Sequence, residues 1–114
     1  MNYEEMSDFE INKWIWRQTK SPKTMYVSSE YQRVFHDAYE IHEFDPCNNP
    51  SDAWSIMNEC RIEIRRDTCQ AHVSSYFNPE FVIHCKNDEF EILRAAMICF
   101  LLMKDAENDN RSAN

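Results

Sequence analysis

Glycine does not occur at all in this chain of 114 residues. At the average usage of about 7%, a chain of this length would hold about eight glycines. Loops that cradle phosphate groups need glycine so that the backbone can approach the ligand, which excludes a P-loop and a dinucleotide-binding fingerprint. Turns that require a positive φ must use other residues, and we expect Asn48, Asn78 and Asn87 to take that role.

An excess of positive charge and a long apolar run are also missing. The chain has 12 Lys and Arg against 20 Asp and Glu, a formal net charge of −8. Contacts of Lys and Arg with phosphates supply most of the affinity for nucleic acid, so we expect no direct binding to it. The longest apolar run, residues 95–103, is about half of the roughly 20 residues that a membrane span needs. We therefore expect no membrane partner.

Nothing at the start of the chain is typical of a secretory signal. The first eleven residues carry four acidic side chains and no apolar run. The five cysteines form an odd set, which suits a reducing compartment better than a disulfide framework. We therefore expect free thiols and a protein that stays in the cytoplasm where it is made.

Capping signals predict where two helices begin. Ser7 with Glu10 three residues later is a capping box, and this helix should end before residues 21–22, Ser-Pro. Asn49 before Pro50 places an N-cap next to a proline at the first helical position. The expected inward positions are Ile11, Trp14 and Ile15 in the first helix, with Trp16 off that face, and Ala53, Trp54, Met57 and Cys60 in the second.

Alternation of apolar and polar residues predicts strands in the second half. Residues 61–65 and 69–73 alternate with period two, and a turn at residues 67–68 would make them a hairpin. Residues 81–85 predict a third strand, more apolar and so expected to be central. Short extended pieces are expected near residues 25–27 and 39–41. A last helix should begin near Asp88, capped by Asn87, and is apolar on nearly all sides.

These elements together predict an α+β fold. We expect a small antiparallel sheet of three or four strands packed against about three helices. Residues 1–104 should form a single domain, because 114 residues leave little room for a second. The wholly polar residues 105–114 should be a disordered tail.

Three stretches resemble the NinX family of small phage and prophage proteins. They are residues 7–13 (SDFEINK), 45–54 (DPCNNPSDAW) and 93–103 (LRAAMICFLLM), about a quarter of the chain, and no clear match lies between Trp14 and Phe44. The helix, hairpin and final helix are also similar to a wider group of small phage domains with an α-β-α sandwich. The resemblance implies an accessory gene of a temperate phage, expressed in the cytoplasm of a bacterial host, and it brings no catalytic residue and no cofactor.

The best candidate for binding a partner is an acidic segment with interleaved aromatics. Residues 30–45 hold five carboxylates against one arginine, a net −4. Exposed aromatics carry binding energy in protein interfaces, and acidic groups steer a basic partner, although packing of the aromatics in the core is the alternative. The candidate residues are Glu30, Tyr31, Phe35, Asp37, Tyr39, Glu40, Glu43, Phe44 and Asp45.

Metal and thiol chemistry have weaker signals. Cys47, Cys60, Cys69, His72, His84 and Cys85 are soft ligands in sufficient number for zinc, but no Cys-x-x-Cys pair occurs. In a strand, Cys69 and His72 would point to opposite faces, as would the neighbours His84 and Cys85. With five cysteines and four histidines, some Cys–His pair is close by chance, so we expect neither a metal site nor a cysteine nucleophile.

The function expected from these observations is non-enzymatic. The chain should bind a host protein that has a basic or nucleic-acid-binding surface, as an inhibitor of anti-phage defence or of nucleic-acid machinery, of the anti-CRISPR or nucleic-acid-mimic type. Two alternatives stay open. One is a self-associating structural or regulatory protein, a homodimer through the apolar final helix. The other is a small metal-dependent hydrolase that uses the acidic cluster or the Cys and His set.

Overall fold

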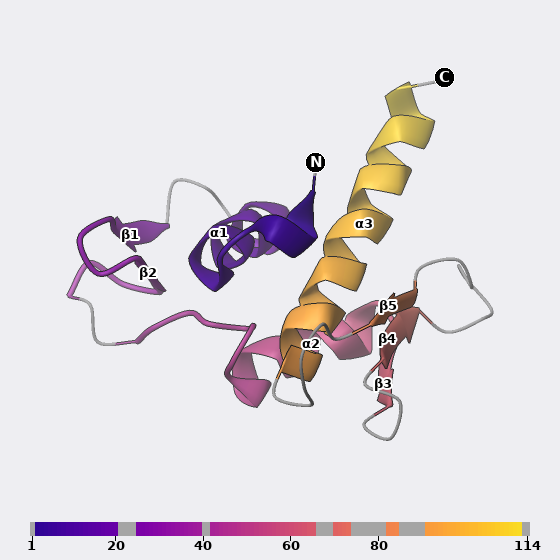
Figure 1. Ribbon diagram of the computed structural model, residues 1–114. Coiled ribbons are helices and arrows are strands. Elements are labelled where there is room, and N and C mark those ends of the chain that lie inside the picture. Colours follow the sequence, from indigo (N-terminus) through magenta and orange to yellow (C-terminus); the bar gives the residue numbers. More distant parts are fainter. Residues whose placement is uncertain are drawn as a thin grey trace.

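Helices and short antiparallel strands share the chain, as the α+β prediction requires. The computed structural model describes residues 2–20, 25–39, 42–65, 70–73, 82–84 and 91–112. In these residues it contains three α-helices, one 3₁₀ turn (Tyr3–Glu5) and two antiparallel sheets, of two and three strands. Helix α3 runs through the middle, with α1 on one side and the three-stranded sheet on the other (Figure 1).

The first helix, α1, spans Asp8–Thr19 and begins as its capping box predicts. The Glu10 N–H donates to Ser7 Oγ over 3.2 Å, which satisfies one of the amides that a helix leaves unpaired at its start. Ile11 and Ile15 are buried as predicted, and Trp14 is half-buried against the core. The prediction that Trp16 lies off this face was wrong, since Trp16 is buried, as is Asn12. Trp16 is covered because His36 and Phe44 pack edge-on against its ring, at centroid distances of 5.3 and 5.0 Å.

The second helix, α2, spans Pro50–Glu59 and also begins where predicted, with Asn49 Oδ1 accepting the Ser51 N–H over 3.0 Å. The prediction of an inward Trp54 was wrong, because this side chain is 67% exposed. Ile56 takes the inward place instead. Positions 53, 56 and 57 lie on one face of a helix at spacings of three and four, and position 54 is rotated about 100° away.

Strands β1 (Tyr26–Ser28) and β2 (Arg33–Phe35) form a hairpin beyond α1 (Figure 1). The piece expected near 25–27 is confirmed as β1, but the next strand is residues 33–35 rather than 39–41. Tyr39 lies in a turn, and residues 40 and 41 fall outside the described part. Strands of three residues are too short for a period of two to reveal.

Positive φ angles occur at two non-glycine residues in the described part of the chain. Gln32, at the end of the β1–β2 turn, has φ 52°, and Arg61, just after α2, has φ 55°. Asn48 does not adopt this conformation, so that prediction was wrong, and Asn78 and Asn87 lie outside the described residues. The left-handed conformation is therefore imposed on two side chains that do not favour it.

Strands β3 (Ile62–Arg65), β4 (Gln70–Val73) and β5 (Val82–His84) form the larger sheet, in the order β3-β4-β5. The predicted hairpin is confirmed, and its register places Ile62 opposite Val73 and Ile64 opposite Ala71. The expectation that the third strand is central was wrong, since β4 pairs with both of the others. β4 is central because it is the middle one of three consecutive antiparallel strands. This order does not depend on how apolar each strand is.

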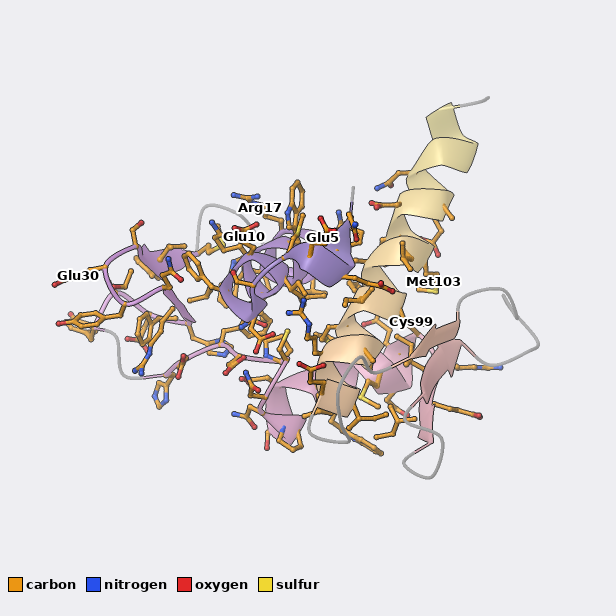
Figure 2. All side chains as sticks on the ribbon, viewed as in Figure 1. Glu5, Glu10, Arg17, Glu30, Cys99 and Met103 are labelled. Carbon is orange, nitrogen blue, oxygen red and sulfur yellow. The ribbon has the colours of Figure 1, made fainter. Side chains whose placement is uncertain are left out.

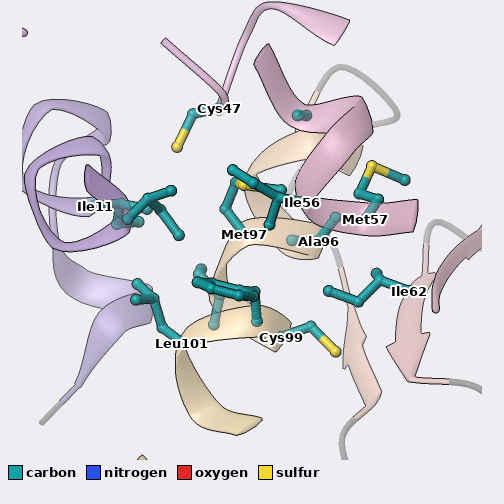
Figure 3. Packing of buried hydrophobic residues seen from close by; sticks show 14 of the residues in the cluster. Ile11, Cys47, Ile56, Met57, Ile62, Ala96, Met97, Cys99 and Leu101 are labelled. Carbon is teal, nitrogen blue, oxygen red and sulfur yellow. The ribbon is translucent and has the colours of Figure 1, made fainter. Parts of the chain in front are cut away.

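Helix α3 (Ile92–Ser112) is the centre of the core and packs against α1, α2 and all three strands of the larger sheet. Met97 and Leu101 face Ile11, Ile56 and their neighbours in the close view (Figure 3). The start expected near Asp88 with its Asn87 cap lies outside the described residues. The helix continues to Ser112, so residues 105–112 are helical and not the disordered tail we expected. Tyr3 donates to the Asp105 carboxylate and Lys104 pairs with Glu107, which holds this polar part of the helix in place.

Candidate functional site

The three stretches that carry the family resemblance meet in one network of side chains. Arg94 from α3 pairs with Asp8 at the start of α1, and Asp8 also accepts from Asn48 over 3.0 Å. Asn48 donates to both Asp45 oxygens, at 3.2 and 3.1 Å, and Asn12 donates to Asp45 Oδ1 over 2.8 Å. We call these five residues the polar clamp. It joins α1, the segment before α2, and α3, which are far apart in the sequence.

Arg94 also fastens the N-terminal turn to α3. One of its terminal nitrogens donates to the main-chain carbonyls of Glu4, at 3.2 Å, and Met6. A guanidinium offers five donors in a fixed fork, so one side chain can serve a carboxylate and several carbonyls at once. A lysine has no such fork, and this explains an arginine in an otherwise apolar stretch of the helix.

Cys47 lies under the polar clamp. Its N–H donates to Asn12 Oδ1 over 3.4 Å, and the residue is 1% exposed. Burial raises the pKa of the Cys47 thiol well above its ordinary value, and the nearby carboxylates of Asp8 and Asp45 raise it further. The thiolate is the nucleophilic form of cysteine, so this environment disfavours a covalent role for Cys47.

The polar clamp is satisfied within the chain. In the described residues, no buried side-chain nitrogen or oxygen lacks a hydrogen-bond partner. Nor do three His, Cys, Asp or Glu side chains come together there as ligands for a metal ion. The hydrogen bonds of the clamp therefore serve to hold α1, the segment before α2, and α3 together. This supports a structural role for the three stretches that carry the family resemblance.

A different surface lies on the β1–β2 side of the molecule. We call the described residues 26–39 and 42–44 the acidic arm. Tyr31 is 65% exposed and Tyr39 is 83% exposed. Two short turns present these rings: the Tyr31 N–H donates to Ser28 Oγ over 3.3 Å, and the Tyr39 N–H donates to Asp37 Oδ1 over 2.9 Å. Glu30 stands at the far end of the arm, away from α3 (Figure 2).

The nine candidate residues for partner binding separate into two groups. Glu30, Tyr31, Tyr39 and Glu43 are exposed and Asp37 is half-exposed, all on the acidic arm, where Glu43 lies 3.7 Å from Arg33. Phe35 and Phe44 are buried, at 6% and 2% exposure, so the core alternative holds for them. Asp45 belongs to the polar clamp, and Glu40 lies outside the described residues. Sequence could not separate these groups, because both contain aromatics and carboxylates in the same segment.

Of the cysteines and histidines considered as ligands, the structure describes Cys47, Cys60, His72 and His84. Cys47 is buried in the core, as is Cys99, and Cys60 is half-buried. Burial also raises the pKa of Cys60. Cys69 and Cys85 lie outside the described residues. His72 in β4 is paired with Val82, and His84 in β5 with Gln70, so the two histidines do not face each other across the strands.

The apolar surface of α3 has an explanation inside the chain. Its buried residues are covered by α1, α2 and the larger sheet, so an apolar helix does not by itself call for a second copy of the chain. None of the helices in the described ranges has the length and the apolar character to cross a membrane. The helix that the sequence shows to be apolar on nearly all sides is thus packed on more than one side.

Sequence reasoning missed three members of the polar clamp. Asp8, Asn12 and Arg94 were seen only as parts of motifs. A signal was available for Arg94, which is the only cation between residues 92 and 103. A charged side chain in an apolar stretch of helix must find partners, so it predicted hydrogen bonds to other parts of the chain. No pattern marked Asn12 as inward, because it follows Ile11 by one residue and a helix turns by about 100° per residue.

Comparison with known proteins gives one match. A family model described as Bacteriophage P22, NinX matches residues 2–104. No curated protein and no solved structure matches the chain. The matched range contains all three stretches of the polar clamp. It also covers residues 15–43, where we had found no clear resemblance, so the acidic arm belongs to the matched region as well.

Proposed function

Because the chain belongs to the NinX family of bacteriophage proteins, we propose that it is a phage accessory protein that acts without catalysis, by binding a host protein in the bacterial cytoplasm. The observation that carries the proposal is the exposure of Tyr31 and Tyr39 among carboxylates on the acidic arm. Large aromatic rings held in water cost solubility and gain nothing for the fold, so their exposure favours a contact surface.

The charge of the arm indicates the kind of partner. Glu30, Asp37 and Glu43 lie on the arm with the two tyrosines, against one arginine, Arg33, and the whole chain carries a net −8. Carboxylates at the rim of an interface speed the encounter with a basic protein and disfavour an acidic one. Basic surfaces on host proteins are often meant for DNA or RNA. A partner in anti-phage defence or nucleic-acid machinery, inhibited by an acidic protein that occupies its nucleic-acid surface, fits this chemistry.

The test is affinity capture from host cells with three forms of the tagged chain. The forms are the unchanged protein, the double variant Tyr31→Ala/Tyr39→Ala, and Trp54→Ala, which removes an exposed aromatic outside the arm. We expect a basic host protein that the unchanged chain and Trp54→Ala retain, that the double variant loses, and that salt releases. The captured protein is then purified and its binding to nucleic acid is measured with and without the phage protein.

Two results would contradict the proposal. Capture that yields only chaperones would remove the partner, and equal retention by the double variant would remove the acidic arm from the interface. The two alternative functions have their own measurements. Light scattering that shows a strict monomer excludes the self-associating protein, and metal analysis of folded protein purified without chelators, if it finds no metal, excludes the metal-dependent hydrolase.

A further inference from the structure

A hollow of about 300 Å³ lies where the end of α1, the residue after β2 and α2 come together. Lys20, His36, Phe44, Asp52, Ser55 and Glu59 are among the residues that line it. We call it the α2 hollow. None of these residues belongs to the polar clamp. His36 and Phe44 belong to the acidic arm, so the hollow lies between the arm and α2.

One stripe of α2 forms the acidic wall of the hollow. Asp52, Ser55 and Glu59 follow each other at spacings of three and four, so they lie on one face of the helix. Two turns of helix separate the two carboxylates by about 10 Å along the axis. Asp52 is held in place, since its Oδ2 accepts the Asp45 N–H over 2.9 Å and its Oδ1 lies 3.8 Å from His36 Nε2. A carboxylate offers about four lone-pair sites, so Asp52 retains the capacity to accept from a ligand.

His36 and Phe44 bring aromatic rings into the lining of the hollow. His36 and Phe44 pack edge-to-face with centroids 5.3 Å apart, and both contact Trp16. The Lys20 ammonium lies 5.4 Å from the centroid of the Trp16 ring. Aromatic faces attract cations, and this contact shows that the cluster already holds one at the rim of the hollow. Carboxylates beside aromatic rings are the surroundings that a cationic group with a flat shape prefers.

We propose that the α2 hollow receives the guanidinium group of an arginine side chain of the host partner. This inference rests on the proposed function and names the group by which the basic partner is recognised. Guanidinium can pair with Asp52 or Glu59, donate to the Ser55 hydroxyl and lie against His36, whereas the ammonium of lysine offers no planar face. Asp52 and Glu59 outnumber Lys20 in the lining, so the hollow favours one added positive charge.

The test is a titration of the full chain, followed by NMR of its backbone amides, with blocked arginine (N-acetyl-arginine methylamide). Blocked lysine and blocked glutamine are the comparison probes. We expect saturable shifts at Ser51, Ser55 and His36, with an affinity for arginine above that for lysine and at least about tenfold above that for glutamine, because a charged hydrogen-bonded contact is worth this much.

Variants of one acidic and one basic side chain of the hollow test the inference further. Glu59→Gln should weaken the binding of blocked arginine at least about threefold, and Lys20→Ala should strengthen it, because the competing cation is removed. Glu5→Gln removes one exposed carboxylate outside the hollow and should leave the affinity unchanged. Shifts that do not saturate, equal binding of blocked glutamine, or an effect of Glu5→Gln equal to that of Glu59→Gln would overturn the inference.

The result is separable from that of the proposed function. If blocked arginine does not bind but capture of a host protein still depends on Tyr31 and Tyr39, only the inference about the α2 hollow fails. If blocked arginine binds the hollow as described and no host protein is captured, the inference about the hollow holds for the isolated chain and the proposed function fails.

Discussion

The polar clamp and the acidic arm are made of similar residue types and use them in opposite ways. In the clamp, Asp8, Asp45 and Arg94 pair with groups of the same chain. On the arm, Tyr31 and Tyr39 stay in water beside carboxylates. A charged or polar residue in a recognisable motif is therefore no sign of a working site here. The residues that we propose for partner binding are those that the fold leaves exposed.

Position relative to α3 explains the difference. The segments of the clamp pack on α3, so their polar groups are partly removed from water and must be paired. The hairpin of the arm packs against α1 through β2 and extends beyond it (Figure 1). Its solvent-facing residues are under no such requirement. Four comparisons test whether the clamp and the arm differ in this way.

The largest effect is expected from the arginine of the clamp. Arg94→Met leaves Asp8 and several carbonyls of the N-terminal turn without their donor. Hydrogen bonds to a charged group contribute about 1.5 to 3 kcal/mol, and Asp8 stays partly in water, so the free energy of unfolding should fall by about 2 to 4 kcal/mol. Arg33→Met removes an arginine from the arm, where its pair with Glu43 is exposed, and should cost less than about 1 kcal/mol. Urea denaturation measures both. Equal losses would show that the arm is as essential to the fold as the clamp.

A smaller effect is expected from the buried amide of the clamp. Asn12→Ala removes the donor to Asp45 and the acceptor of the Cys47 N–H, at a cost of about 1 to 3 kcal/mol. Tyr39→Ala on the arm should change stability by less than about 0.5 kcal/mol. Thermal unfolding of the two variants at one pH gives the comparison. A loss of stability in Tyr39→Ala that matches Asn12→Ala would mean that the exposed ring serves the fold.

The sequence predicted the starts of helices and the position of a strand well where a short local pattern determines them. Ser7 and Asn49 fixed the starts of α1 and α2 because a side-chain oxygen next to a helix start satisfies an amide there and hardly anywhere else. The alternation around Ile62 and Ile64 fixed β3 for the same kind of reason, since it is the signature of a half-buried strand.

Prediction from sequence failed where the burial of a side chain depends on segments far away in the chain. Trp16 is buried because Phe44, 28 positions later, packs on it, and Trp54 is exposed because α2 meets α3 through Ile56. The acidic arm shows the same limit, since Tyr31 and Phe35 lie four residues apart in one segment, yet Tyr31 is exposed and Phe35 is buried. No periodic pattern of a three-residue strand carries that information. The α2 hollow needs three separate elements, so sequence could not reveal it.

The third comparison uses pH. The Cys47 thiol has an ordinary pKa of 9.0, and burial raises it well above that in the folded chain. Protonated thiol is thus favoured by folding. The stability that it contributes is complete below pH 9 and is lost as the pH rises above 9 toward the folded pKa, because the unfolded chain then releases the proton first. In that window, each such group makes the free energy of unfolding fall by about 1.4 kcal/mol per pH unit.

Cys47→Ala should therefore give a shallower fall of stability between pH 9 and pH 10 than the unchanged chain has, whatever its stability at pH 7. Tyr3 adds to the fall above pH 10.0, because burial and its hydrogen bond to Asp105 raise its pKa too. Urea titrations at a series of pH values measure the slope. An identical slope in Cys47→Ala would show that the thiol is as accessible to ionisation in the folded chain as in the unfolded one.

The smallest effect is expected in the turn of the arm, and it has the opposite sign. Gln32 has φ 52°, a conformation that costs a residue with a Cβ about 1 kcal/mol or more and costs glycine almost nothing. Gln32→Gly also makes the unfolded chain more flexible, so the net gain in stability should be about 0.5 kcal/mol. Ser29→Gly, in the same turn but without a positive φ, should lose about as much. If both variants lose stability in thermal unfolding, the left-handed turn at Gln32 is not strained, and the arm is then as well adapted to its sequence as the clamp is.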